Sequence, residues 1–126
     1  MIYWPYLAPL LVVFALSMAG KAEMFRTATA ILLNWVLGTA FVLATGVYDP
    51  WLFWIALDAV TAWAILYHPA GNVQALIGAL YMSQILCHGL YALSNPILAQ
   101  HTYWQILTAL AFVQLALLGG WIGALL

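Results

Sequence analysis

Long apolar runs separated by short breaks dominate this sequence and leave few architectures open to it. A helix needs about 20 mainly apolar residues to cross the hydrocarbon core of a bilayer. Candidate runs extend over about 5–20, 27–45, 51–67, 73–93 and 96–118. Each run is predicted to be a transmembrane helix. The chain is therefore expected to be an all-α membrane protein, a bundle of about five helices.

The scarcity of charge supports this class. Only 4% of the 126 residues are charged and 68% are hydrophobic, whereas a soluble domain carries about 25% charged residues. Five charged side chains cannot cover the exterior of a soluble protein, so the lipid bilayer is the predicted partner. The net charge of −1 provides no basic surface for nucleic acid, and a nucleic-acid partner is not expected.

The breaks between the runs are only a few residues long and contain turn-forming residues. Pro50 is predicted as the first helical residue of the third run, and Asn95 and Pro96 are predicted as the cap and first residue of the fifth. Gly119-Gly120 is a candidate bend near the end of that run. Short connections favour antiparallel neighbours in sequence order. Residues 1–126 are predicted to form one transmembrane domain.

The positive charges predict the orientation of the bundle. Lys21 and Arg26 lie together between the first two runs, and positively charged loops favour the cytoplasmic side. The N-terminus and the turns at Asp49 and Asn95 are then outside, and the turn at 68–72 and the C-terminus are inside. The first run opens without the lysine or arginine of a signal peptide, so it is predicted to be a retained span.

Asp58 is the unusual residue of the third run. It lies about ten residues before His68, roughly 15 Å from the cytoplasmic end of a helix. An ionised side chain at that depth costs at least about 2.5–3.5 kcal/mol, and no lysine or arginine falls within a run to pair with it. Two interpretations stay open: a hydrogen bond that fixes helix packing, or a role with a proton, an ion or a substrate.

Polar residues of neighbouring runs align with Asp58. The fourth run carries a stripe of such residues on one helical face, since helical residues advance by about 100° each. Polar atoms on a membrane helix should face protein or water, and we predict an interior polar seam made of Asp58, Asn34, Thr61, Tyr81, Gln84 and His88. The carboxyl of Asp58 should then lie within hydrogen-bond reach of Asn34, Tyr81 or Gln84. The alternative is that these residues only hold helices together, within a monomer or an oligomer, through hydrogen bonds.

His88 and His101 lie at similar predicted depth on the fourth and fifth runs. Facing imidazoles on adjacent helices can bind a haem or a metal, but no other ligand set accompanies this pair, and no cofactor is predicted. The single cysteine, Cys87, excludes an internal disulfide. No phosphate-binding loop, nucleophilic triad or zinc motif is present. No catalytic residue is therefore predicted, and the chain is not expected to be an enzyme.

The stretch from Asp58 to Tyr91, with His68-Pro69-Ala70-Gly71, Gln74, Gln84 and His88, resembles small uncharacterised multi-span membrane proteins encoded by tailed bacteriophages. This resemblance covers about a quarter of the chain. It implies no established activity, and it implies a location in the membrane of a bacterial host or in a virion component destined for that membrane. The bacterial inner membrane is the predicted location. The uncharged end over 120–126 departs from the charged cytoplasmic tail usual in holins, which argues against a lysis role.

Two functions are compatible with these features. The first, which the sequence slightly favours, is a structural or interaction subunit that assembles with itself as a homo-oligomer or joins a larger membrane complex. The second is a pore or transport element that conducts protons, water or a small cation past Asp58.

Overall fold

The computed structural model describes residues 4–47, 50–94 and 100–125, and these residues are helical with no strand among them. A short 3-10 helix, η1 (Trp4–Tyr6), leads into α1 (Leu7–Ser17). The longer helices are α2 (Ala22–Thr45), α3 (Trp51–Leu66), α4 (Asn72–Ser94) and α5 (Gln100–Leu125). The prediction of an all-helical chain is confirmed for this part of the sequence.

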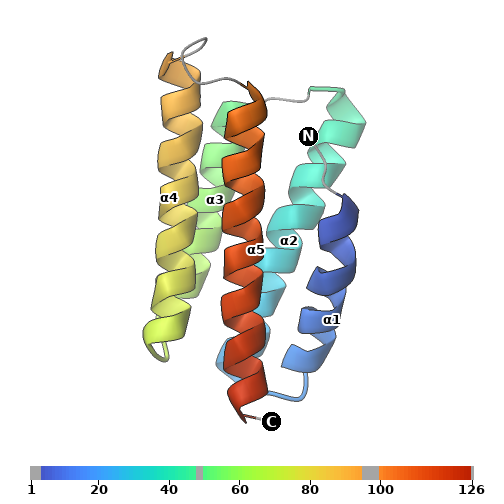
Figure 1. Ribbon diagram of the computed structural model, residues 1–126, viewed down its shortest axis with the longest axis vertical. Coiled ribbons are helices and arrows are strands. Elements are labelled where there is room, and N and C mark those ends of the chain that lie inside the picture. Colours follow the sequence, from blue (N-terminus) through green and yellow to red (C-terminus); the bar gives the residue numbers. More distant parts are fainter. Residues whose placement is uncertain (1–3, 48–49, 95–99, 126) are drawn as a thin grey trace.

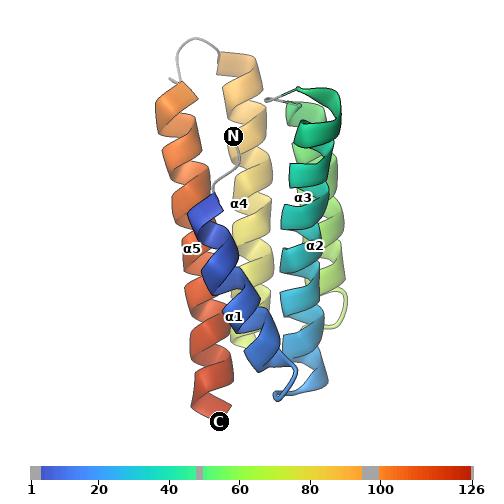
Figure 2. The same cartoon turned by 90° about the vertical axis from the view of Figure 1, so that its right-hand side faces the viewer.

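The helices form an up-and-down bundle. In Figures 1 and 2, α2, α3, α4 and α5 run along the long axis, and the shorter α1 lies across α2 and α5. The close approach of α3 and α4 depends on Gly78, because a Cβ there would lie 2.5 Å from the Leu66 side chain. Neighbouring helices are antiparallel because the chain reverses at each short connection.

Three helices are long and apolar enough to cross a membrane. They are Ala22–Thr45, Asn72–Leu93 and Gln100–Leu125, whereas Trp4–Ser17 and Trp51–Leu66 are shorter apolar segments. Large apolar side chains also cover the outside of the bundle, among them Val60, Trp63 and Leu86. An outer surface of this kind is suited to lipid, since monomeric soluble proteins rarely expose large contiguous apolar patches.

Helix α2 begins at Ala22, five residues before the predicted start at Thr27. Lys21 caps the helix in an extended conformation, and Glu23 lies in the first turn, where a negative charge suits the positive end of the helix dipole. The prediction was wrong because it took the start of the apolar run as the start of the helix. A helix can extend into the polar interface beyond its apolar segment.

Two other boundaries also differ from expectation. Pro50 is the cap of α3 and not its first helical residue, since its φ of −81° and ψ of 71° lie outside the helical region. Helix α5 continues through Gly119-Gly120 to Leu125. Continuing the helix keeps backbone groups hydrogen-bonded where water is scarce. The predicted turn at Asp49 and the predicted cap at Asn95-Pro96 lie outside the described residues.

Side-chain hydrogen bonds connect the turn between α3 and α4 with the start of α2. Gln74 is fully buried. Its Oε1 accepts the Ala70 backbone N–H at 2.7 Å, and its Nε2 donates to Thr27 Oγ1 at 2.9 Å. On the same end of the bundle, the Arg26 guanidinium donates to the His68 carbonyl at 2.8 Å. These contacts fix the register of α2 against the turn.

Replacing Gln74 with leucine should therefore destabilise the protein. The Ala70 N–H and the buried Thr27 hydroxyl would each lose a hydrogen bond, and a bond of this kind contributes about 0.5–1.5 kcal/mol. Reversible unfolding in detergent measures the change. Gln105→Leu on the exposed face of α5 is the matched control, and an equal loss from both variants would contradict a special role for Gln74.

Candidate functional site

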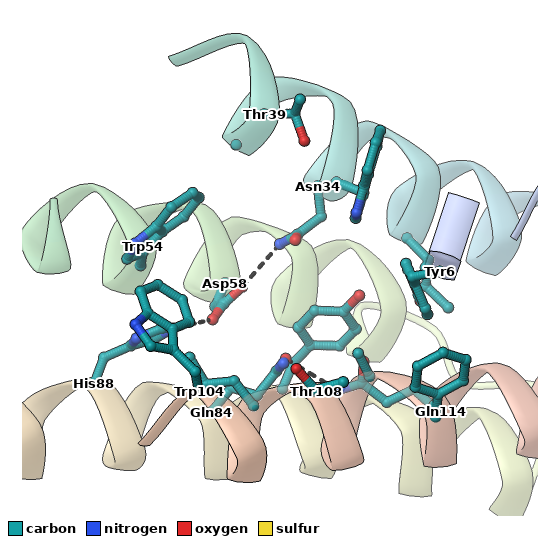
Figure 3. Close-up of a pocket in the computed structure, with 17 residues that line it drawn as sticks. Tyr6, Asn34, Thr39, Trp54, Asp58, Gln84, His88, Trp104, Thr108 and Gln114 are labelled. Atoms are coloured by element: carbon teal, nitrogen blue, oxygen red, sulfur yellow. Dashed lines mark hydrogen bonds and ion pairs between the residues drawn. The ribbon is translucent and has the colours of Figure 1, made fainter. Parts of the chain in front are cut away.

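Asp58 is the centre of a buried hydrogen-bond network. Asn34 on α2 donates through Nδ2 to Asp58 Oδ1 at 2.8 Å and to Thr61 Oγ1 at 2.9 Å. His88 on α4 places Nε2 at 2.9 Å from Asp58 Oδ2. Figure 3 shows these side chains meeting the carboxyl from two sides. Both carboxyl oxygens therefore have a partner from another helix.

The network continues into α5 through the second nitrogen of His88. His88 Nδ1 is hydrogen-bonded to the Tyr103 hydroxyl, and both residues are buried. The Tyr103 ring stacks on Tyr91, with centroids 4.0 Å apart and an angle of 6° between the planes. Asn34, Asp58, His88 and Tyr103 thus link α2, α3, α4 and α5 in one chain of contacts.

A neutral imidazole satisfies every bond in this network. In that state His88 donates its Nε2 proton to the Asp58 carboxylate and accepts the Tyr103 hydroxyl proton at Nδ1. Asn34 adds a further donor to the carboxylate. Lys21 and Arg26 are the only lysine and arginine residues of the sequence. Both precede the apolar part of α2. In this assignment the site holds one negative charge, on Asp58.

A cavity of about 150 Å³ lies beside this carboxyl. Its walls come from η1 and the four longer helices, and Asn34, Asp58, Tyr81, Gln84 and His88 contribute polar groups to it. A buried cavity of about 150 Å³ is large enough to hold a benzene molecule in another protein. The cavity can therefore admit a small molecule or several waters.

Gly38 and the segment before α1 both contribute to the walls of the cavity. Gly38 lies one turn after Asn34 on α2 and packs against the indole of Trp54, so that a Cβ at position 38 would overlap that ring. Helix α1 is much shorter than α2 and α5 and lies between them over only part of their length (Figure 2). Tyr6 of η1 lies at the cavity wall.

The cavity includes a polar pair that the sequence analysis missed. Gln114 on α5 is buried and donates through Nε2 to Gln84 Oε1 at 3.0 Å. The sequence contains a spacing signal for Gln114. It lies at helical spacing on the same face of α5 as three other residues, and all four are buried in the structure: Tyr103, Leu107, Gln114 and Leu118. Trp104 and Tyr6 also line the cavity, and the sequence analysis assigned neither residue to the seam.

The structure brings the six residues of the predicted seam together. Asn34 and His88 contact Asp58 directly, Thr61 is bonded to Asn34, and Tyr81 and Gln84 line the cavity. The bond from Asn34 is one of the three contacts that the sequence analysis expected for Asp58.

The structure does not assemble the His88 and His101 pair as ligands. Both ring nitrogens of His88 are already engaged, and His101 is exposed in the first turn of α5. Tyr103, two residues further along α5, contacts His88 where the metal or haem hypothesis would place His101. Within the described part of the chain, no group of three histidine, cysteine or acidic residues could hold a metal ion.

Comparison of the chain with protein-family models, with curated proteins and with solved structures gives no match.

Proposed function

We propose that this chain is an integral membrane protein that crosses the bilayer five times, with the N-terminus outside and the C-terminus inside. The three long apolar helices and the antiparallel bundle support this topology. Helix α3 has 16 residues, or about 24 Å of helix, and it is packed between long neighbours. The resemblance to phage-encoded multi-span proteins supports a bacterial inner membrane as the location.

Cysteine labelling tests this topology. In a Cys87→Ala background, a membrane-impermeant maleimide added outside should label Asp49→Cys and fail to label Gly71→Cys. The reason is that Lys21 and Arg26 should stay in the cytoplasm together with the turn at 68–72. Labelling after membrane permeabilisation is the control for reactivity. The reverse pattern would invert the topology, and labelling of both positions from outside would contradict the third span.

We further propose that the protein is a pore or transport element that admits a small cation to Asp58. The observation that carries this proposal is the cavity of about 150 Å³ whose wall includes the buried Asp58 carboxyl. A carboxyl used only for packing needs no space beside it. Here the space is lined by further hydrogen-bonding groups, among them Gln84 and Gln114, which can hold water or a permeating ion.

The electrostatics of the site favour a positive ligand. A buried carboxylate in surroundings of low dielectric attracts a cation more strongly than one in water. The intramembrane position of an acid is itself typical of ion and proton pathways. His88 and Asn34 hold the carboxyl in place through both of its oxygens, so that it faces the cavity in a fixed geometry.

Flux measurements on reconstituted protein test the proposal. Liposomes containing the protein should dissipate an imposed gradient of protons, sodium or choline faster than empty liposomes of the same lipid. A pH-sensitive dye follows protons, and isotope uptake follows the other two ions. Rates equal to those of empty liposomes for all three cations would overturn the transport function.

A structural or interaction subunit is the second candidate. The observation in its favour is that the Asp58 network joins four helices within one chain, as packing bonds do. The large apolar side chains on the outside of the bundle would then contact lipid, a second copy or a partner subunit. Under this proposal Asp58 stabilises the bundle and conducts nothing.

A further inference from the structure

We infer that the cavity beside Asp58 binds a small organic ammonium ion, either a quaternary ammonium or a protonated amine. This inference rests on the proposed admission of a cation to Asp58 and names the chemical class of that cation. It follows from the aromatic walls, the charge and the size of the cavity.

The walls of the cavity are unusually rich in aromatic rings. The contributing residues are Tyr6, Trp35, Trp54, Tyr81, Trp104 and Phe112. Aromatic faces attract organic cations, and cages of such rings are the usual means of recognising quaternary ammonium groups. Edge-to-face packing between Tyr6 and Phe112, with centroids 5.3 Å apart, holds two of these rings in fixed positions. The ring set therefore provides a preformed surface for a cation with an apolar body.

The charge of the cavity also favours an organic cation. Asp58 is the acidic residue that lines it, and neither Lys21 nor Arg26 does so. A metal cation such as calcium takes about six to eight oxygen ligands, and a single carboxylate with amide neighbours is a poor set for it. An organic ammonium needs one counter-charge and apolar contact for its carbon atoms. Asp58 and the aromatic rings provide these two features.

The size of the cavity suits a small organic ion. A volume of about 150 Å³ suits a molecule the size of choline, which carries both a quaternary ammonium and a hydroxyl.

Choline and its uncharged analogue 3,3-dimethylbutan-1-ol separate charge recognition from simple filling of the cavity. The two molecules have nearly the same shape, since a carbon replaces the quaternary nitrogen. Calorimetric titration of the purified full chain in a neutral detergent should show saturable binding of choline. The analogue should bind at least about tenfold more weakly, because it loses the charge interaction and the cation–π contacts.

A pair of tryptophan variants locates the site. Trp35→Leu should weaken choline binding by about threefold to tenfold, as expected for the loss of one cation–π contact, and Trp35→Phe should retain most of the affinity. Trp63→Leu is the matched control, because Trp63 is 65% exposed on the outside of α3 and is not part of the cavity wall. Its affinity for choline should equal that of the wild type.

Several results would overturn the inference. Equal affinity for choline and its analogue would show an apolar cavity without charge recognition, and equal losses in Trp35→Leu and Trp63→Leu would place binding elsewhere. Flux of protons or sodium without any choline binding would remove the ammonium ligand and leave the transport function standing. Absence of both flux and binding would remove the two together.

Discussion

Asp58→Asn is expected to reduce cation flux to the level of empty liposomes while the bundle stays folded. Asparagine has nearly the volume of aspartate and still forms hydrogen bonds, but it offers no negative charge and cannot release a proton. Its contacts with Asn34 and His88 can therefore be replaced in part. Measured hydrogen bonds within membranes average about 0.6 kcal/mol, so the change in stability should be small. Flux in liposomes and thermal unfolding in detergent measure the two effects.

Glu23→Gln is the matched control for this experiment. It also neutralises one acid, but Glu23 lies in the first turn of α2 and does not line the cavity. Its flux should equal that of the wild type. Wild-type flux in Asp58→Asn would contradict the role of the carboxylate, and a folded, inactive wild type would favour the structural subunit.

His88→Ala is expected to cause the largest loss of stability in the chain. The substitution removes the partner of Asp58 Oδ2 and of the Tyr103 hydroxyl together, and it enlarges the cavity. Leaving a buried polar group without its partner costs about 1–3 kcal/mol, and more for a charged group. A loss of about 3 kcal/mol is expected here, because the Asp58 carboxyl and the Tyr103 hydroxyl lose a partner together and the missing ring leaves empty space. Reversible unfolding in mixed detergent micelles measures this loss.

The control for this prediction is His101→Ala. His101 is exposed at the start of α5, and substitutions at such surface positions usually change stability by less than about 0.5 kcal/mol. Similar losses for the two variants would show that the His88 contacts contribute nothing beyond the helix itself. A Tyr103→Phe variant removes only the hydroxyl and should cost about 1 kcal/mol.

The helical class and the members of the polar seam could be predicted from the sequence alone. Apolar runs of about 20 residues are long enough to cross a bilayer as helices, which satisfy their own backbone hydrogen bonds in a medium without water. The rotation of about 100° per residue decides which side chains share a face. Asp58 and Thr61 therefore had to lie on one side of α3, as Tyr81, Gln84 and His88 had to do on α4. A buried acid without a cation in its run also had to find polar partners.

Only the tertiary structure decided which faces meet. Tyr103 and His101 are two residues apart, and their side chains therefore point about 200° apart around α5. The rotation of that helix determines which of them meets His88, and packing of the whole bundle sets that rotation. The same holds for Gln114 opposite Gln84 and for the cavity, whose walls come from η1 and four different helices. Helical periodicity fixes directions within one helix, whereas the distance and rotation between helices depend on every side chain packed between them.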